Sequence, residues 1–156
     1  MKEQYLTEIE LPVWADPQGD VILEKSRDYC YLYFDCWLEK ELWINEEVTW
    51  ADYIGKITFN NAWAVKSLDI EFYDIYPKEE SIYKSSICRV ENSLWLEEMT
   101  MKRSKTYKEW LSWDERIYKH FHFSGHDNYF DIIAENYKVE KILKKDIKHY
   151  ENLWTQ

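Results

Sequence analysis

Residues 116–134 constrain the fold more than any other part of the chain, because two alternating stretches flank a short polar turn. Apolar residues alternate with other residues over 116–123 and again over 129–134, while residues 124–128 are Ser-Gly-His-Asp-Asn. Successive side chains of a strand point to opposite faces, so such alternation is typical of β-structure. Gly, Asn and Asp favour a tight turn between the stretches. The segment therefore predicts a β-hairpin and an antiparallel sheet.

Further strands are expected in five short segments, which are residues 8–11, 29–38, 57–59, 62–73 and 85–90. The segment 29–38 is apolar on both alternating faces, which suits a central strand that is covered on both sides. The segments 57–59 and 62–73 are expected to pair as a hairpin about Asn60 and Asn61, because Asn tolerates the left-handed conformation of tight turns. Residues 16–20, which contain Asp, Pro and Gly, predict a turn.

Two helices are expected. Asn92 and Ser93 can cap a short helix that begins at Leu94, because short polar side chains accept the free N–H groups of a first turn. Near the end of the chain, apolar residues recur at helical spacing with lysines between them, which predicts a C-terminal amphipathic helix. The residues of that apolar stripe are Val139, Ile142, Leu143, Ile147 and Tyr150.

These elements predict a mainly β or α+β fold. An antiparallel sheet, as a sandwich or a partly closed barrel, is expected to carry one or two short helices. Aromatic residues make up 18% of the chain, and their flat rings favour the pleated surface of strands. No internal repeat or change in composition marks a linker, so residues 1–156 are expected to form one globular domain.

The charge balance restricts the partners of the chain. The net charge is −10 and the pI is about 4.9, which disfavours a nucleic-acid partner because nucleic acids require a basic surface. No apolar run approaches the roughly 20 residues of a membrane span, and the first residues lack the apolar core of a signal peptide. Three cysteines, Cys30, Cys36 and Cys88, are expected to be buried free thiols. A cytoplasmic protein without membrane contact is expected.

Common catalytic motifs are absent from the sequence. Three well-separated glycines cannot form a dinucleotide fingerprint or a phosphate-binding loop, and there is no His-Glu-x-x-His or Gly-x-Ser-x-Gly motif. No catalytic residue is therefore assigned, no cofactor is expected, and an enzyme is the less favoured interpretation.

One polar cluster in the predicted hairpin could carry chemistry. His120 and His122 share a strand face, and Tyr129 and Asp131 are expected to join them from the other arm. Two imidazoles and a carboxylate could hold zinc or ferrous iron, with His120, His122 and Asp131 as ligands, or serve as acid and base for a small substrate. The alternative is a hydrogen-bonded hairpin surface without a ligand.

Acidic residues lie on one face of the predicted strand at 62–73 and just beyond it. Asp69, Glu71 and Asp74 could form a paired-carboxylate site, but acids on the solvent face of an amphipathic strand explain them as well. As a surface feature, the same three residues are candidate contacts for a basic partner.

Three segments resemble a pattern in small bacterial proteins that stand alone as single domains with no assigned activity. They are Ile-Thr-Phe-Asn-Asn-Ala-Trp-Ala at 57–64, Arg-Val-Glu-Asn-Ser-Leu-Trp-Leu at 89–96, and the hairpin from His-Phe-His at 120–122 to Ile-Ile-Ala at 132–134. The resemblance spans roughly residues 55–135, and it implies no catalytic role. In size, acidity and aromatic content the chain is also similar to immunity proteins that neutralise secreted bacterial toxins.

Three functional hypotheses follow from these observations. The favoured one is an interaction domain with an acidic surface that binds a basic protein, and a toxin-neutralising immunity protein is one form of it. The second is a small-molecule or metal-binding domain or enzyme centred on the 116–134 hairpin. The third is a structural or assembly role through an exposed sheet edge or aromatic patch.

Overall fold

The computed structural model describes residues 2–38, 50–73, 76–77 and 86–147. Within them, the helices are α1 (Leu94–Thr106) and the short 3-10 helices η2 (Ile70–Phe72), η3 (Trp110–Ser112) and η4 (Lys144–Asp146). The strands are β1 (Tyr5–Glu8), β2 (Trp14–Ala15), β3 (Val21–Lys25), β4 (Tyr29–Trp37), β5 (Trp50–Asn60), β6 (Ala64–Asp69), β7 (Ile87–Glu91), β8 (Lys119–Ser124), β9 (Asn128–Ala134) and β10 (Asn136–Leu143).

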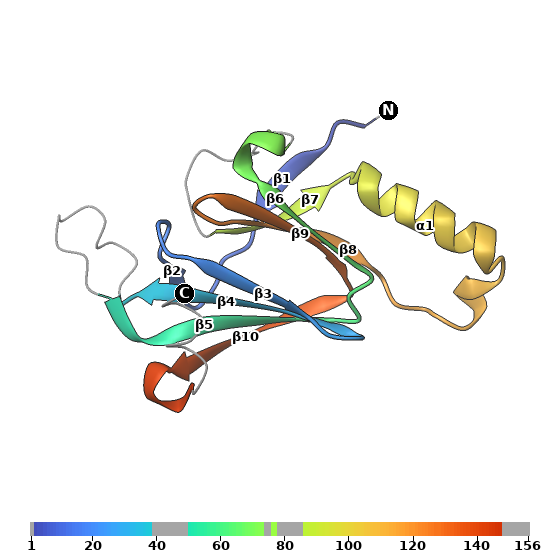
Figure 1. Ribbon diagram of the computed structural model, residues 1–156. Helices are drawn as coiled ribbons and strands as arrows, with labels where there is room; N and C mark the ends of the chain where they lie inside the picture. Colours follow the sequence, from blue (N-terminus) through green and yellow to red (C-terminus); the bar gives the residue numbers. More distant parts are fainter. Residues whose placement is uncertain (1, 39–49, 74–75, 78–85, 148–156) are drawn as a thin grey trace.

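The strands form two antiparallel sheets that face each other in two layers (Figure 1). The first sheet has the order β1-β7-β8-β9-β6. The second has the order β10-β5-β4-β2, and β3 also pairs with β4. The predicted mainly antiparallel fold is confirmed, and its form is a two-layer sandwich whose sheets are not closed into a barrel.

The core lies between the two sheets and is built from the inward faces of β4, β5, β8 and β9. Phe34 packs on Phe123 and Phe59 packs on Phe121, each with ring centroids 5.3 Å apart. Gly55 is required beside Phe34, because a Cβ atom at this position would lie 2.3 Å from the phenylalanine ring. Aromatic pairs of this kind link the two sheets directly. That residues 1–156 form one domain stays a prediction.

The strongest sequence predictions are confirmed. The hairpin at 116–134 forms as β8 and β9, with Phe121 opposite Ile132 and Phe123 opposite Phe130. Helix α1 begins after Ser93, whose Oγ accepts a hydrogen bond from the Leu96 N–H at 3.0 Å. Residues 16–20 form the predicted turn, in which the carboxylate of Asp16 accepts from the Gln18 N–H at 2.9 Å.

The hairpin predicted about Asn60 and Asn61 is wrong. Strand β5 pairs with β4 and β10 in the second sheet, whereas β6 pairs with β9 in the first. The left-handed conformation is present at Asn61, with φ of 51°, but here the turn carries the chain from one sheet to the other. Alternation specifies which faces of a strand are apolar and leaves its partner open. The predicted strand also ends early, at Asp69, and η2 follows it.

The C-terminal amphipathic helix is also wrong over the described residues. Residues 136–143 form β10, which pairs with β5 along its whole length, and η4 follows. Tyr137 and Val139 pack against the core at a spacing of two, so strand periodicity overrides the helical spacing within this short segment. Tyr150 lies outside the described residues.

Two further expectations need correction. The central position of β4 is confirmed, but its second face is not covered, because Tyr31 and Tyr33 are only half-buried and Tyr29 is exposed. The first strand covers Tyr5–Glu8 rather than residues 8–11.

The cysteines fit the prediction: Cys30, Cys36 and Cys88 are buried and free. Burial raises the pKa of the Cys30 and Cys36 thiols to about 12, so both are uncharged at neutral pH. In the part of the chain that the structure describes, no helix is both long enough and apolar enough to cross a lipid bilayer.

Candidate functional site

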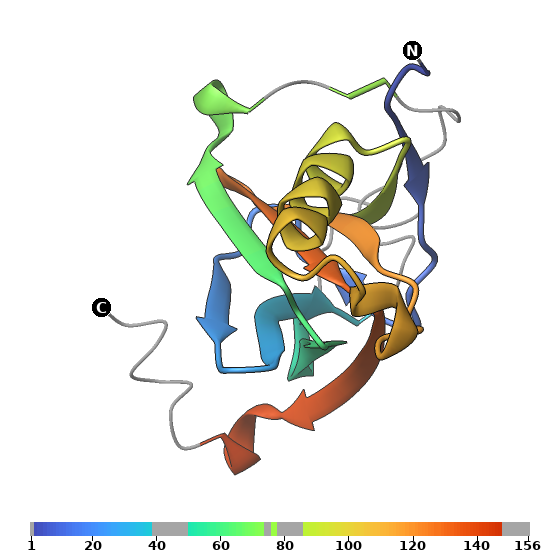
Figure 2. The same cartoon turned by 90° about the vertical axis from the view of Figure 1, so that its right-hand side faces the viewer.

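Helix α1 contacts the first sheet at its beginning and then projects past the ends of the strands (Figure 1). In Figure 2 it therefore points toward the viewer, in front of β8 and β9. Because none of the residues of α1 is buried, apolar packing along the helix does not hold α1 against the sheet. Two polar clusters, one near each end of α1, tie it to the rest of the molecule.

The first cluster, the histidine network, consists of Ser93, His120, His122 and Asp131. Ser93 Oγ lies 2.6 Å from His120 Nδ1, and His120 Nε2 lies 2.5 Å from Asp131 Oδ1. The same carboxylate oxygen lies 3.1 Å from His122 Nδ1. His122 and Asp131 are directly opposite each other in the β8–β9 ladder, which explains why they meet. The hairpin thus gathers both histidines and the aspartate on the outer face of the first sheet.

The protonation states follow from burial and hydrogen bonding. Burial alone raises the pKa of Asp131, but the hydrogen bonds from both histidines outweigh it and lower the pKa to about 2. Burial lowers the pKa of His120 further than the hydrogen bond to Asp131 raises it, so this ring is neutral at pH 7. Because the Nε2–H of His120 donates a hydrogen bond to the ionised Asp131, Nδ1 carries no proton and accepts a hydrogen bond from the Ser93 hydroxyl.

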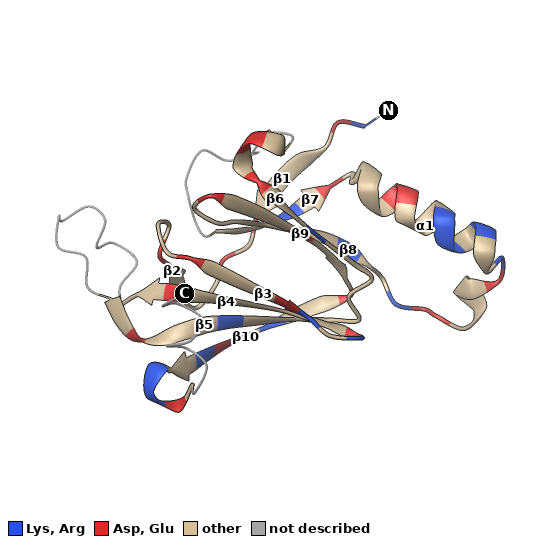
Figure 3. Cartoon of the chain, viewed as in Figure 1, with Lys and Arg blue, Asp and Glu red and all other residues tan. Residues whose placement is uncertain are grey.

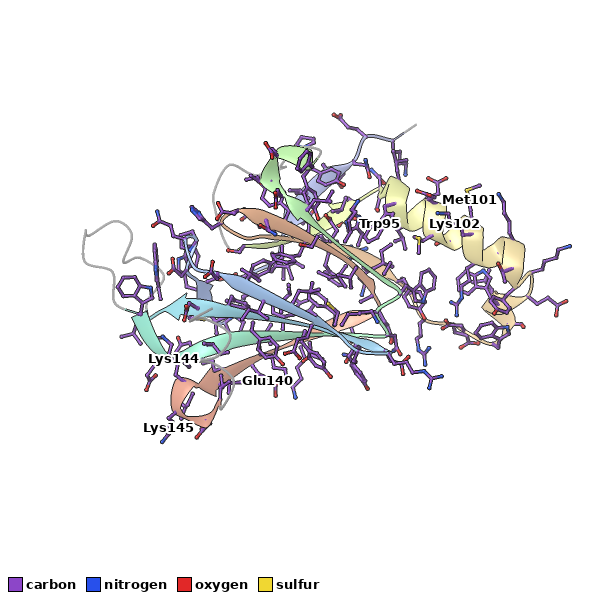
Figure 4. All side chains as sticks on the ribbon, viewed as in Figure 1. Trp95, Met101, Lys102, Glu140, Lys144 and Lys145 are labelled. Atoms are coloured by element: carbon purple, nitrogen blue, oxygen red, sulfur yellow. The ribbon has the colours of Figure 1, made fainter. Side chains whose placement is uncertain are left out.

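Aromatic rings enclose the histidine network. His120, His122 and Asp131 are 1%, 3% and 0% exposed. The edge-on contacts, by ring centroids, are Trp95 to His120 at 5.1 Å, Tyr129 to His122 at 4.9 Å, Tyr76 to His122 at 5.8 Å and Tyr73 to His122 at 6.0 Å. Trp95 comes from the first turn of α1 (Figure 4). Tyr129 therefore joins the predicted residues through its ring, as part of the wall around His122.

The donor set of the network does not fit a zinc or iron site. Both ring nitrogens of His120 are engaged in hydrogen bonds, one with Ser93 and one with Asp131, so neither is available to a metal ion. Among the described residues, no group of three or more His, Cys, Asp or Glu side chains has an arrangement that could hold a metal. The residues present favour a polar anchor for the start of α1.

The second cluster, the arginine cage, holds the end of α1. The guanidinium carbon of Arg103 lies 4.6 to 4.9 Å from the ring centroids of three tryptophans, which are Trp63, Trp110 and Trp113. Arg103 Nη1 donates to Asp114 Oδ2 at 2.7 Å, and the Tyr118 hydroxyl donates to the same oxygen at 2.7 Å. Cation–π contacts and a partly buried ion pair thus fix α1 and the loop after it to the sandwich.

The loop that the cage supports carries large apolar side chains into solvent. This apolar surface consists of Tyr107, Leu111, Trp113 and Ile117, which are 58%, 68%, 60% and 74% exposed. The Tyr107 and Trp113 rings meet edge to face at 6.2 Å. Met101 is also 56% exposed but lies on the side of α1 that faces away from this loop (Figure 4). Apolar side chains that gather on one surface are candidates for an interaction site, whereas scattered single ones are not.

A surface hollow of about 470 Å³ adjoins Ser93, and another of about 510 Å³ adjoins Trp113. The second hollow is lined by Trp113, Glu115, Arg116 and Glu135, together with Ser112 and the buried Asp114. It therefore combines an indole ring with the exposed carboxylate of Glu115 and with the half-buried Glu135, which lies 3.7 Å from Arg116.

The predicted partner contacts lie elsewhere. Asp69 ends β6 and Glu71 lies in η2, and both are exposed beside Ile70 and Phe72, which are 47% and 67% exposed. Asp74 lies outside the described residues. The structure does not bring Asp69 or Glu71 to the histidine network, and their role as partner contacts stays a prediction.

Sequence reasoning missed two relationships. It assigned Ser93 to a helix cap only, although the cap residue also binds His120. It also did not connect Arg103 with Asp114, eleven positions apart, because no local pattern links a helix to the loop that folds back on it. The dense tryptophans of segment 110–113 were the one available signal.

Comparisons with protein-family models, curated proteins and solved structures found no significant match to this chain. The resemblance to small bacterial proteins that the sequence motifs suggested thus gains no support from them.

Proposed function

We propose that this protein is a binding domain for a basic protein, and that the partner docks on the apolar surface formed by Tyr107, Leu111, Trp113 and Ile117. The observation that carries the proposal is the exposure of these four side chains on a loop that a partly buried ion pair holds in place. Burying a large apolar side chain stabilises a complex by about 1.5–3 kcal/mol, so leaving four of them in water is costly unless a partner covers them.

The support beneath this surface favours binding over a core-packing role. Trp113 receives Arg103 against its ring at 4.9 Å, yet the side chain is 60% exposed. The loop is thereby pre-organised, which lowers the entropy cost of association. Tryptophan, tyrosine and arginine are also the residues that most often dominate the energy of interfaces.

Charge favours a basic partner. The chain carries a net charge of −10, and its field accelerates encounter with a protein of opposite sign. Basic residues lie on the second half of α1 and again on β5, β10 and η4, and acidic ones are spread over the sandwich (Figure 3). Next to Trp113 the hollow is lined by Glu115, Arg116 and Glu135, and a lysine or arginine of the partner would meet the indole ring and the exposed Glu115 carboxylate there. Asp69 and Glu71 are proposed as contacts of the same partner outside this surface.

A narrower form of the proposal is an immunity protein, whose basic partner is a toxin that it neutralises. A reducing compartment such as the cytoplasm fits three buried free cysteines.

Site-specific photo-cross-linking in the native host tests the proposal. A photoreactive residue replaces Leu111 or Trp113, and in the control it replaces Lys138, whose side chain is 69% exposed on β10 of the second sheet. We expect one basic protein to cross-link from positions 111 and 113 and not from 138. That protein, once purified, should bind the unmodified chain in a binary assay.

The proposal is wrong if positions 111 and 113 give no adduct, or if they give the same adducts as position 138. It is also wrong if the cross-linked protein is acidic. Charge reversal at Glu115 then tests the acidic region beside Trp113, and charge reversal at Asp69 and Glu71 tests the other acidic region. Each reversal should slow association only if the region that it changes faces the partner.

A further inference from the structure

The histidine network reaches the surface at one residue. Ser93 is 9% exposed and lines the hollow of about 470 Å³, whereas His120 and Asp131 behind it are closed to solvent. The hollow falls within the range of roughly 300–1,000 Å³ that is usual for small-molecule sites. Its other lining residues are Lys2, Asn92, Leu94, Leu96 and Glu97.

The order of hydrogen bonds in the network is that of an activated serine. Ser93 Oγ, His120 and Asp131 follow one another at 2.6 Å and 2.5 Å, with the imidazole between the hydroxyl and the carboxylate. In such an arrangement the imidazole takes the serine proton and the carboxylate stabilises the imidazolium that forms. A helix cap alone requires only the bond from the Leu96 N–H to Ser93 Oγ, so the bond between Ser93 and His120, and the one between His120 and Asp131, go beyond capping.

The backbone around Ser93 suits the same chemistry. Asn92 has a left-handed φ of 55° at the sharp turn between β7 and α1, so Ser93 stands at the point where a strand becomes a helix. The first N–H groups of a helix have no acceptor within the helix, and here the Gln4 side chain accepts from the Leu94 N–H and Ser93 Oγ accepts from the Leu96 N–H. The N-terminal end of α1 favours negative charge. Negative charge develops on the carbonyl oxygen of a substrate when a nucleophile attacks the carbonyl carbon.

We propose that Ser93 is a nucleophile for small carboxylic esters that enter this hollow, with His120 as general base and Asp131 as the residue that positions His120. Ser93 Oγ forms a bond to the ester carbonyl carbon while its proton passes to His120 Nδ1. The carbonyl–alkoxide bond then breaks, and the leaving alkoxide takes that proton as an alcohol. Water attacks the acyl-serine by the same proton route, which releases the acid and restores the hydroxyl.

The experiment uses a fluorophosphonate probe on the purified full-length chain. Ser93 Oγ attacks phosphorus, fluoride leaves, and the hydroxyl proton goes to His120 and then to solvent. We expect a single adduct by intact-mass spectrometry, mapped to Ser93 by peptide sequencing. The variant Ser93→Asn keeps a good helix cap without a nucleophile and should give no adduct.

Two further measurements separate an activated serine from a merely reactive one. Asp131→Asn, checked for folding by circular dichroism, should label at least about 100-fold more slowly, in line with the effect of removing a positioned base. In the unaltered protein, the labelling rate should level off at high pH, with its midpoint below about pH 6.5, because burial lowers the pKa of His120.

No adduct at Ser93, under conditions that fully label a known serine esterase, would overturn the proposal. So would a rate that rises with hydroxide without levelling off, and this readout does not depend on any variant. Labelling is measured without a protein partner, so its failure would leave the proposed binding function untouched.

Discussion

The change Asp131→Asn tests whether the histidine network stabilises the fold. The Asp131 side chain is completely buried, and one of its oxygens accepts from both His120 and His122. Each hydrogen bond to a charged group contributes about 1.5–3 kcal/mol. Asparagine retains one acceptor oxygen but loses the charge and adds two buried donors. We therefore expect a loss of about 3 kcal/mol, within the range of about 3–5 kcal/mol for breaking a buried charged pair.

Urea denaturation followed by circular dichroism measures this loss. For a slope of about 2 kcal/mol per molar, the unfolding midpoint should fall by roughly 1.5 M. The matched control is Asp127→Asn in the turn of the same hairpin, where the side chain is 83% exposed and faces the exposed His126 at 3.7 Å. That exchange should change the stability by less than about 0.5 kcal/mol. A loss below about 1 kcal/mol for Asp131→Asn would show that the network is not an anchor.

Three other perturbations have defined outcomes. Acid should destabilise the fold in two stages. Below about pH 6.5 the unfolded state takes up a proton at His120, because the pKa of His120 is lower in the folded state. Between about pH 4 and 2 the fold loses the contribution of Asp131, which is about 2 kcal/mol for a pKa lowered from 3.8 to about 2, and urea midpoints that stay flat from pH 8 to pH 2 would contradict both stages. Gly55→Ala places a Cβ atom 2.3 Å from the Phe34 ring and should cost at least about 1–3 kcal/mol in thermal unfolding, and a neutral result would be incompatible with this packing. Arg103→Met removes the closer of the two cations beside the buried Asp114 and leaves Arg116 at 3.7 Å; it should lower stability by about 1.5–3 kcal/mol and change the near-ultraviolet circular dichroism of the tryptophans, whereas an unchanged spectrum would argue against the cage.

The fold could be predicted where local chemistry and tertiary structure agree. The hairpin of β8 and β9 has clean alternation, and its turn contains Gly, Asp and Asn, so both levels specify the same pairing. Ser93 caps α1 because its side chain satisfies an N–H group within the same turn, which is a local interaction.

Prediction failed where the deciding interactions lie far apart in the sequence. The spacing of Val139, Ile142 and Leu143 fits a helix, but pairing with β5, about 80 residues earlier, makes this segment a strand. Asn61 has the left-handed turn conformation that was expected, yet the next strand joins the other sheet, a choice that depends on the partner β9.

In the candidate site, too, the local relationships could be predicted from the sequence and the long-range ones could not. The shared face of His120 and His122 follows from strand geometry, and Asp131 meets them because the register of a two-arm hairpin is local. The apolar surface could not be predicted, because the exposure of Leu111 and Ile117 depends on how the loop docks through Arg103 and Asp114.

The affinity of the purified chain for the protein cross-linked at position 113 tests the central claim most directly. Titration calorimetry would compare the unaltered chain with Trp113→Ala and with Lys138→Ala, both of which change exposed side chains. An anchor residue contributes at least about 2 kcal/mol, so Trp113→Ala should weaken binding by about 30-fold or more. Lys138→Ala should leave the dissociation constant unchanged. Equal affinities for Trp113→Ala and the unaltered chain would contradict the assignment of this surface to partner binding.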